Sequence, residues 1–265
     1  MAIEINSIAN PKRILAIKFS SIGDIVLTIS PLKTIKSIFP SAKIDFLTLN
    51  DFAPILEGNK FIDRIILFDR NAGFVKLIKT GKWINNSDYE LIIDFHNSLR
   101  SKIIRFNIRN IPNMYLKKPR WKRFLLFRFR KNLFPTDFSQ IKLLHQPIKE
   151  WMNNKEYPFP ELFISEIERE KAEMMLDRNS VKKPYITIIP GAAWPQKTWL
   201  IDNYCKLLSD LKNNENVDFV ILGGKNDNIC NGIAKCDPTI INLQGKTSLR
   251  ESMSIIANSK YVIGA

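Results

Sequence analysis

Residues that build metal centres and disulfide frameworks are scarce in this sequence. It has three cysteines, Cys205, Cys230 and Cys236, an odd number whose spacing matches no zinc motif. Its two histidines, His96 and His145, lie far apart in the chain, so a histidine-based zinc site is not expected either. We therefore predict reduced thiols, as in a cytoplasmic protein, and no bound metal.

Long apolar runs are also missing. No stretch approaches the roughly 18–20 residues that a helix needs to cross a membrane. The first residues, MAIEINSIANPKR, lack the apolar segment of a signal peptide. With 265 residues, 45% of them hydrophobic and 25% charged, the chain has a globular composition. This length predicts one large domain or two ordinary ones.

One region contains no acidic residue. Between Asp94 and Asp137 there are twelve lysines and arginines, nearly as many as the whole net charge of +14. A concentration of one sign attracts anions, so the candidate partners are nucleic acid, an anionic membrane surface or a phosphorylated acceptor. The twelve cations are Arg100, Lys102, Arg105, Arg109, Lys117, Lys118, Arg120, Lys122, Arg123, Arg128, Arg130 and Lys131.

Short apolar runs alternate with helical patterns in the first part of the chain. This alternation predicts a parallel sheet covered by helices on both faces. A long basic stretch, predicted to be mostly helical, follows from Leu99 to Met152. The predicted strands are Ile14–Phe19, Lys43–Leu49, Arg64–Phe68 and Leu91–Phe95, and the predicted helices are Ile25–Phe39, Phe52–Leu56 and Phe74–Lys79.

A second alternating series starts after NNKEYPFPELFIS, a polar, proline-containing segment that we predict to be a linker. We therefore expect two Rossmann-like domains, residues 1–160 and 161–265. The last predicted strand has no loop or helix after it, so we expect the second domain to be incomplete and the sequence to be truncated. The predicted helices are Glu166–Asp177, Ile201–Lys212, Asn228–Lys235 and Leu249–Asn258, and the predicted strands are Pro184–Pro190, Val217–Leu222, Thr239–Asn242 and Tyr261–Ile263.

The stretch SSIGD, Ser20 to Asp24, joins the first predicted strand to the first predicted helix. The N-terminal amides of a helix face a ligand at such a junction, and the small residues Ser21 and Gly23 leave room for one. A single glycine does not make a GxGxxG dinucleotide motif. Two interpretations of Asp24 stay open. It is either a helix cap, contributing about 0.5–2 kcal/mol, or a group with chemistry to perform.

A second loop, PGAAWPQKTW, also follows a strand and precedes a helix. Gly191, Ala192 and Ala193 permit close approach of the backbone to a ligand, and Lys197 offers a point charge for phosphate. Thr198 lies beside that lysine. The alternative is an ordinary exposed loop lysine.

Two further loops lie at the predicted ends of strands. In GGKND, the pair Gly223 and Gly224 either turns the chain or lets a base or ribose lie against the backbone. In QGKTSL, Thr247 or Ser248 is expected to cap the last helix.

The segment DFHNSLRS places Asp94 and His96 at a strand end, with Arg100 one turn later. The Asp–His proximity suggests acid/base chemistry, although such residues are more often structural. Arg100 could clamp an acceptor anion.

Farther on, KKPRWKRFLLFRFRKNLF interleaves aromatic residues with cations. This pattern is typical of nucleic-acid binders, and it also describes a basic helix lying on an anionic membrane. A solvated helix with its phenylalanines partly in the core remains the third possibility.

Taken together, these stretches resemble glycosyltransferase family 9, the ADP-heptose:lipopolysaccharide heptosyltransferases. The resemblance rests on RILAIKFSSIGDIVLTISPLKTIKSIFPSAKIDFLT, YELIIDFHNSLRS, IIPGAAWPQKTWL, VDFVILGGKND and INLQGKTSLRESMSIIANSKYVIGA. It implies a GT-B fold, in which an N-terminal acceptor-binding and a C-terminal nucleotide-sugar-binding Rossmann-like domain face a cleft. It also implies an inverting, metal-independent transferase that moves a heptose or similar sugar from an ADP-sugar to lipopolysaccharide core.

The resemblance assigns roles residue by residue. It makes Asp24 the catalytic base and Lys197 the catalytic phosphate-binding lysine, and it places Thr247 near the adenine pocket. Relatives carry hydroxyl side chains where this chain has Ala192 and Ala193, so contacts there must come from the backbone. The full set expected to bind the donor is Gly191, Ala192, Ala193, Thr198, Gly223, Gly224 and Thr247. The set expected to bind the acceptor is Ser21, Gly23, Arg100, Arg120, Lys122 and Arg123.

The expected partners are a nucleotide sugar, with no other cofactor, and an anionic glycolipid at the inner-membrane surface, reached from the cytoplasm. Relatives continue past the last strand into an aspartate–serine/threonine–glycine loop that contacts the donor diphosphate, and the sequence stops at Ala265. The missing loop leaves open a non-catalytic, truncated remnant of a transferase, and the basic tract leaves open a basic nucleic-acid-binding protein on a Rossmann-like scaffold.

Overall fold

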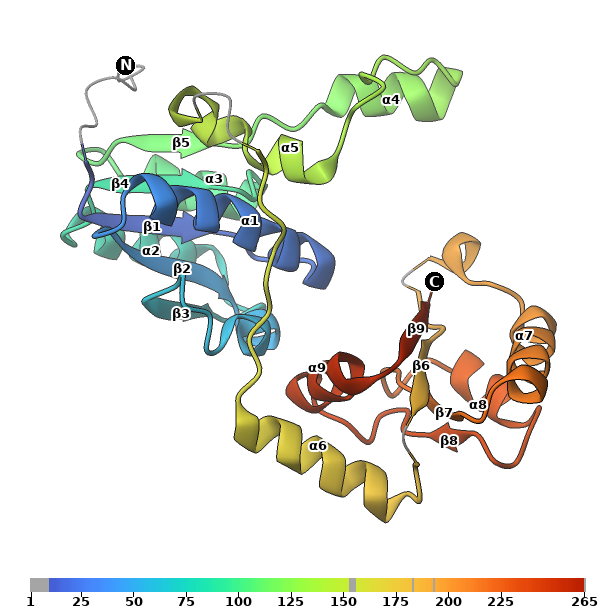
Figure 1. Ribbon diagram of the computed structural model, residues 1–265. Helices are drawn as coiled ribbons and strands as arrows, with labels where there is room; N and C mark the ends of the chain where they lie inside the picture. The colour runs from blue at the N-terminus through green and yellow to red at the C-terminus, as the bar shows by residue number, and fades with distance from the viewer. Residues whose placement is uncertain (1–9, 153–155, 183, 193, 265) are drawn as a thin grey trace. The chain divides into compact units, whose positions relative to one another are not determined.

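The computed structural model describes residues 10–152, 156–182, 184–192 and 194–264 (Figure 1). The chain divides into two compact units, Met1–Phe163 and Ile164–Ala265. Each unit contains one sheet whose paired strands all run parallel. The predicted α/β class with two parallel sheets is confirmed.

The first unit is built on a five-stranded sheet in the order β3-β2-β1-β4-β5. Its central strand β1 pairs with β2 and β4 and is nearly all apolar and buried, as expected for a strand covered on both faces. Because the chain order reverses between β1 and β4, the switch point lies at their carboxyl ends, where open α/β sheets bind ligands. The elements of this unit are β1 (Arg13–Ile17), α1 (Ile22–Ile38), β2 (Lys43–Leu49), η2 (Asn50–Leu56), β3 (Arg64–Phe68), α2 (Phe74–Asn85), β4 (Leu91–Asp94), α3 (Leu99–Phe106), β5 (Asn113–Tyr115), α4 (Arg120–Phe129), α5 (Gln140–Leu144) and η3 (Gln146–Trp151).

The prediction of a mostly helical stretch from Leu99 to Met152 is wrong in part. Strand β5 lies inside it and pairs with β4, with Ile92 opposite Asn113 and Ile93 opposite Met114. Three residues are too few to show an alternating pattern, so pairing with β4 decides their conformation. The helices around β5 are separated by segments without regular structure.

Part of the predicted linker packs against the first unit. The Ser30 hydroxyl on α1 donates to the carbonyl of Pro158, and the Lys33 ammonium pairs with Glu161. The rings of Phe61 and Phe163 meet edge to face, with centroids 6.1 Å apart. These contacts explain why the unit continues to Phe163, whereas the sequence placed the boundary at residue 160.

The second unit has a four-stranded sheet in the order β8-β7-β6-β9. Its chain order reverses between β6 and β9, so the loop after β6 lies beside a second switch point. One core cluster packs α7 against the sheet through Tyr204 and Leu208. A second cluster includes α6 residues Ala172 and Leu176. The elements of this unit are α6 (Glu166–Arg178), β6 (Tyr185–Ile189), η4 (Pro195–Lys197), α7 (Ile201–Asn214), β7 (Asp218–Ile221), α8 (Ile229–Ala234), β8 (Ile241–Asn242), α9 (Leu249–Asn258) and β9 (Tyr261–Gly264).

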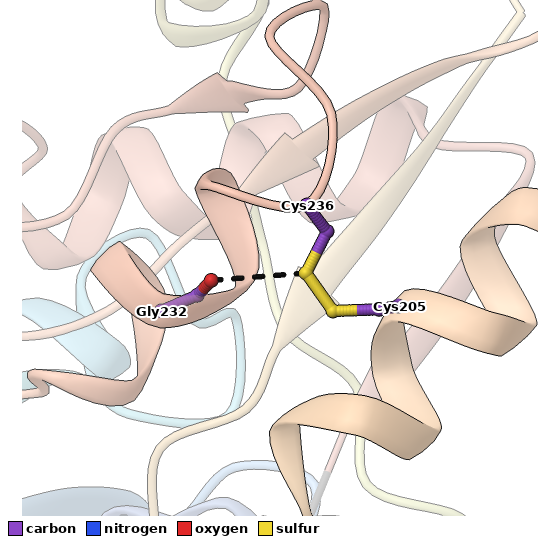
Figure 2. The surroundings of a disulfide bond; sticks show 3 residues. All are labelled: Cys205, Gly232 and Cys236. Carbon is purple, nitrogen blue, oxygen red and sulfur yellow. Dashed lines mark hydrogen bonds between the residues drawn. A yellow bond between two sulfur atoms is a disulfide. The ribbon is translucent and has the colours of Figure 1, made fainter.

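The prediction of three reduced thiols is wrong for two of them. Cys205 on α7 and Cys236, just after α8, form a disulfide that ties these two helices together (Figure 2). Their separation of 31 residues hid this pairing, because neither residue stands in a recognisable motif. Cys230 is free and buried, and burial raises the pKa of its thiol to about 11.

None of the helices in the described ranges combines the length and the hydrophobicity required to cross a membrane.

Candidate functional site

Asp24 lies in the first turn of α1, at the switch point of the first sheet. The helix begins at Ile22 with Ser21 as its N-cap, so Asp24 is not the cap that one interpretation made it. Its carboxylate still benefits from the partial positive charge of the helix N-terminus. The side chain is 38% exposed, so solvent or a substrate can reach it. A Cβ built at Gly23 would have no atom within 4 Å, so there is open space at this residue next to Asp24 in the chain.

Lys18 is the ion-pair partner of Asp24, and no local motif singles out this lysine in the sequence. It follows β1, and its side chain is only 2% exposed. Its Nζ lies 3.3 Å from Asp24 Oδ2 and donates a hydrogen bond of 3.4 Å to the carbonyl of Phe95. Burial lowers the pKa of Lys18, while the nearby Asp24 carboxylate works against that shift. The Asp24 carboxylate is therefore paired with a buried ammonium on its protein side and is partly exposed to solvent.

The end of β4 forms the other wall of this switch point. Asp94 is fully buried, and its Oδ1 accepts hydrogen bonds from the backbone amides of His96 and Asn97 at 2.9 and 2.8 Å. Its Oδ2 lies 2.9 Å from Nε of Arg105. Asp94 thus shapes the loop after β4. Among the described residues, no hydrogen bond joins its carboxylate to the His96 imidazole, whose Nδ1 lacks a partner, so the suggested acid/base pair is not formed through a hydrogen bond.

His96 and Lys118 lie within the electrostatic reach of Asp24 and Lys18. Burial, together with Lys118 and Lys18, lowers the pKa of His96 to about 4. The imidazole is therefore neutral near pH 7, and its Nδ1 is buried without a hydrogen-bond partner in the described structure. Burial, followed by Lys18 and Arg120, lowers the pKa of Lys118. Two carboxylates and several cations therefore gather where β1, β4 and β5 end.

The basic residues expected to bind an acceptor are not all at this place. Arg123 is near enough to lower the pKa of Lys18, after the larger effect of burial. The guanidinium of Arg120 donates to the carbonyl of Asn97 at 3.5 Å. Arg100 points elsewhere and donates to the carbonyl of Arg70 at 2.9 Å. Lys122 lines a hollow beside α4.

In the second unit, the predicted donor loop follows β6. Gly191 and Ala192 lie at the carboxyl end of that strand, and Ala193 lies outside the described residues. Lys197 ends the short helix η4, and its side chain is exposed. Among the described residues, no acid forms an ion pair with it. The charge of Lys197 is therefore available to a ligand, and Thr198 follows it, half-buried.

Asp227 joins the loop after β6 to the loop after β7, although its place in the sequence predicts only a turn. Its Oδ2 accepts a hydrogen bond of 2.6 Å from the backbone amide of Gly224. A Cβ at Gly191 would lie 2.6 Å from the same oxygen, and a Cβ at Gly223 would lie 2.6 Å from Sγ of Cys230. Both glycines are therefore required for packing, and the amide of Gly224 is already in use. An aspartate three residues after a glycine is common in turns, so the sequence does not distinguish Asp227 from an ordinary turn residue.

The loop after β8 completes this edge of the second sheet. Gly245 has a φ of +65°, and its amide donates to the carbonyl of Gly223 at 2.8 Å. Ser248 is the N-cap of α9 and forms a capping box with Glu251, which confirms the expected cap. The hydroxyl of Thr247 lies 2.9 Å from that of Ser252. All the predicted donor residues that are described thus lie at the carboxyl edge of one sheet.

These two edges offer different chemistry. The first presents a reachable carboxylate backed by a buried ammonium, and the second presents an exposed lysine beside glycine-lined loops. Within the described ranges, no group of three or more His, Cys, Asp or Glu side chains is arranged to hold a metal ion. A carboxylate can remove a proton from a hydroxyl group, and a lysine can stabilise a phosphate that gains charge.

A family model described as glycosyltransferase family 9 (heptosyltransferase) matches residues 77–265. Lipopolysaccharide heptosyltransferase 1 of Pseudomonas aeruginosa is 22% identical over 201 residues, which cover 71% of this chain and 54% of that protein. Lipooligosaccharide heptosyltransferase 2 of Haemophilus ducreyi is 25% identical over 272 residues, which cover 95% of this chain and 76% of that protein. The match therefore spans about half the length of the first relative and about three quarters of the second.

Solved structures share the fold. The crystal structure of the family 9 glycosyl transferase from Veillonella parvula has a TM-score of 0.78 at 18% identity, and the match covers 96% of this chain and 75% of that one. The structure of the ADP-heptose lipopolysaccharide heptosyltransferase II from Escherichia coli has a TM-score of 0.73 at 20% identity, with coverage of 95% and 78%. At these identities the likeness establishes the architecture alone.

Proposed function

Because the chain belongs to glycosyltransferase family 9, the heptosyltransferases, we propose that it transfers a heptose, or a similar sugar, to lipopolysaccharide core. The two relatives described above carry names that specify heptose transfer, and one similar structure is titled as acting with ADP-heptose. An ADP-sugar is therefore the proposed donor. We place the enzyme in the cytoplasm, at the surface of the inner membrane, where a lipid-linked acceptor would be met.

The observation that carries this proposal is the pairing of Asp24 with Lys18 at the first switch point. The lysine ammonium lies 3.3 Å from the carboxylate and is buried, whereas the carboxylate is 38% exposed. A general base must lie within hydrogen-bond reach of the proton that it removes, and the ammonium holds this carboxylate in place while the carboxylate stays open to a substrate. Ser21 and Gly23 leave space on the open side for an acceptor hydroxyl.

In the proposed reaction, the oxygen of an acceptor hydroxyl attacks the anomeric carbon of the donor sugar. The bond from that carbon to the diphosphate oxygen breaks, and ADP leaves with the electron pair. Asp24 takes the hydroxyl proton as the new bond forms. A single displacement of this kind inverts the anomeric centre.

The leaving diphosphate gains negative charge as its bond to the sugar breaks. We propose that Lys197 provides the compensating charge directly, without a metal ion. Its side chain is exposed and lies beside the loop that starts at Gly191, where small residues permit close approach. The amide of Gly224 is bound by Asp227, so Gly224 is assigned a packing role instead of a phosphate contact.

The acceptor is proposed to be anionic. Arg120 and Arg123 influence the groups around Asp24 electrostatically, so a phosphate or an acidic sugar next to the reacting hydroxyl would be attracted to this edge. Arg100 is held by the carbonyl of Arg70, so it is a weaker candidate for this contact.

The test measures donor binding and transfer with this chain. Calorimetric titration with ADP and ADP-heptose should give saturable binding, and Lys197→Ala should weaken it by about tenfold or more. Lys206→Ala, an exposed lysine on the neighbouring helix α7, is the matched control and should bind normally. Transfer of the heptose to a glycolipid acceptor is then followed by mass spectrometry. Absence of ADP-sugar binding, together with salt-sensitive binding of an oligonucleotide, would favour the nucleic-acid alternative.

A further inference from the structure

Helix α4 presents an unusual surface, because it buries none of its residues. Trp121, Phe127 and Phe129 are 68%, 83% and 62% exposed. Figure 1 shows α4 reaching away from the β5 edge of the first sheet, between two connections without regular structure. A helix rich in apolar residues normally buries them against its own protein. A group of large exposed apolar side chains therefore marks a surface for an external partner.

Three of the rings form a compact aromatic cluster, consisting of Trp121, Phe124 and Phe129. Trp121 stacks on Phe124 with centroids 5.4 Å apart, and Phe124 meets Phe129 edge to face at 5.9 Å. Phe127 is the most exposed large side chain of the helix. The cluster and Phe127 together offer a hydrocarbon surface that is already assembled in the free protein.

Cations surround this apolar surface, and no acid lies on the helix. The guanidinium of Arg128 lies 5.6 Å from the centroid of the Phe129 ring. Long basic side chains of this kind run along apolar surface and place their charge at its border. The exposed cations of α4 and its C-terminal extension are Arg120, Lys122, Arg123, Arg128, Arg130 and Lys131.

An apolar hollow of about 470 Å³ adjoins the helix and extends its surface. Phe134, Phe138 and Tyr157 contribute to its lining, and Lys122 of α4 and Lys149 supply charge. The basic, apolar character of α4 is therefore continued by its surroundings.

The combination fits a lipid bilayer better than a nucleic acid. Nucleic acids are bound by ring faces that are free to stack on bases, whereas Trp121 and Phe124 already stack on each other. The half-buried Leu125 and Leu126 add aliphatic hydrocarbon that bases do not recognise. Phenylalanine, leucine and tryptophan among lysines and arginines is the composition of interfacial helices on anionic lipid.

We propose that α4 is a membrane-docking helix that inserts Trp121, Phe124, Phe127 and Phe129 into the interface of a bilayer containing anionic phospholipids. Its exposed cations away from Asp24, which are Lys122, Arg128, Arg130 and Lys131, bind the lipid phosphates at the same time. The inference deepens the proposed function and rests on it, because a membrane-docked transferase meets an acceptor that is itself lipid-linked. In this proposal, α4 contacts the hydrocarbon of the bilayer, and Asp24 remains the catalytic base.

The experiment measures partition of the full chain onto vesicles. Wild-type protein should bind vesicles of phosphatidylcholine with about one-third phosphatidylglycerol, and bind phosphatidylcholine alone at least about tenfold more weakly. Trp121→Ser/Phe127→Ser should lower binding to the anionic vesicles by about tenfold or more. Because α4 has no buried residues, this variant should keep the wild-type circular dichroism spectrum. Phe159→Ser is the matched control, since Phe159 is 81% exposed and lies outside the basic region.

Three results would overturn the proposal. They are absence of wild-type binding to anionic vesicles, unchanged binding of the double variant, and an equal loss in the Phe159→Ser control. Oligonucleotide binding that the double variant loses, without any vesicle binding, would assign the helix to nucleic acid instead. Transfer to a water-soluble acceptor should be the same in the wild type and the double variant. Vesicle binding without ADP-heptose binding would reject the proposed function and keep the membrane-docking role of α4. ADP-heptose binding without vesicle binding would reject the membrane-docking role and keep the proposed function.

Discussion

Replacing Asp24 by asparagine affects both the stability of the first unit and the proposed chemistry. The asparagine oxygen can still accept a hydrogen bond from Lys18, so the change removes the charge and keeps the shape. Lys18 then remains a buried ammonium that hydrogen-bonds the carbonyl of Phe95, 3.4 Å away, but the negative charge of Asp24 beside it is gone. The activity of this single variant would therefore fall for two reasons that have to be separated.

The size of the stability effect follows from the geometry of the pair. At the observed 3.3 Å, two unit charges attract by about 5 kcal/mol at an effective dielectric constant of about 20, and by about 1.3 kcal/mol in water. Asp24 is 38% exposed and Lys18 is buried, which places the pair between these limits. We expect Asp24→Asn to lower the free energy of unfolding by about 2–3 kcal/mol, since removing one partner leaves an uncompensated buried charge.

The double variant Lys18→Met/Asp24→Asn removes the uncompensated charge. Methionine fills the space of the lysine stem without an ammonium group, so the free energy of unfolding should return to within about 1 kcal/mol of wild type. Transfer activity should not return. Loss of a general base costs about 10²–10⁴-fold in rate, and both variants should show this loss in kcat with little change in the affinity for ADP.

The assays are urea denaturation for the free energy of unfolding, mass spectrometry for the transfer rate and calorimetry for ADP binding. If Asp24→Asn is as stable as wild type, the two side chains are not coupled as the structure places them. If the double variant recovers both stability and transfer, Asp24 is not the base. If it recovers neither, the loss of stability has a source other than Lys18.

Three further predictions concern other groups. Lys18 has a lowered pKa, so the unfolded chain binds more protons than the folded chain between the folded pKa and 10.5, and the free energy of unfolding rises with pH in that window. In urea titrations, any gain in the free energy of unfolding of Lys18→Met over wild type should therefore shrink as the pH rises across the window. A gain that is independent of pH would contradict the lowered pKa. The Arg250 guanidinium holds the pKa of Glu168 at about 2, against an ordinary 4.5, so this pair stabilises above pH 4.5 and loses its effect as the pH falls toward 2. Glu168→Gln should cost about 0.5–1 kcal/mol at pH 7 after solvent screening, and the difference from wild type should vanish in acid. A difference that is independent of pH would exclude ionisation as its cause. Gly191→Ala should destabilise the second unit, because its Cβ would lie 2.6 Å from the Asp227 carboxylate, and Asp227→Ala in the same chain should restore much of the melting temperature; failure of that rescue would show that the clash is elsewhere.

Much of the secondary structure could be predicted from local patterns of apolar and capping residues in the sequence. Strands β2 and β3 and helix α9 lie where the sequence predicted them, residue for residue. Apolar residues predominate in both strands, and α9 begins with a capping box, so each element has a signal in its own residues. Strand β5 gave no such signal, because three residues become a strand only when β4 lies beside them.

Some features of the candidate site could likewise be predicted from local sequence, and others could not. The sequence alone predicts that Asp24 and the loop that begins at Gly191 follow strands, because strand–loop–helix order is a local property. The three-dimensional fold was needed to show that Lys18 lies buried against Asp24, that Asp94 accepts hydrogen bonds from the backbone and pairs with Arg105, and that Asp227 accepts a hydrogen bond from the amide of Gly224. These contacts depend on which strands lie side by side and on which charged groups are buried together. Neither property can be predicted from the residues near each position in the sequence.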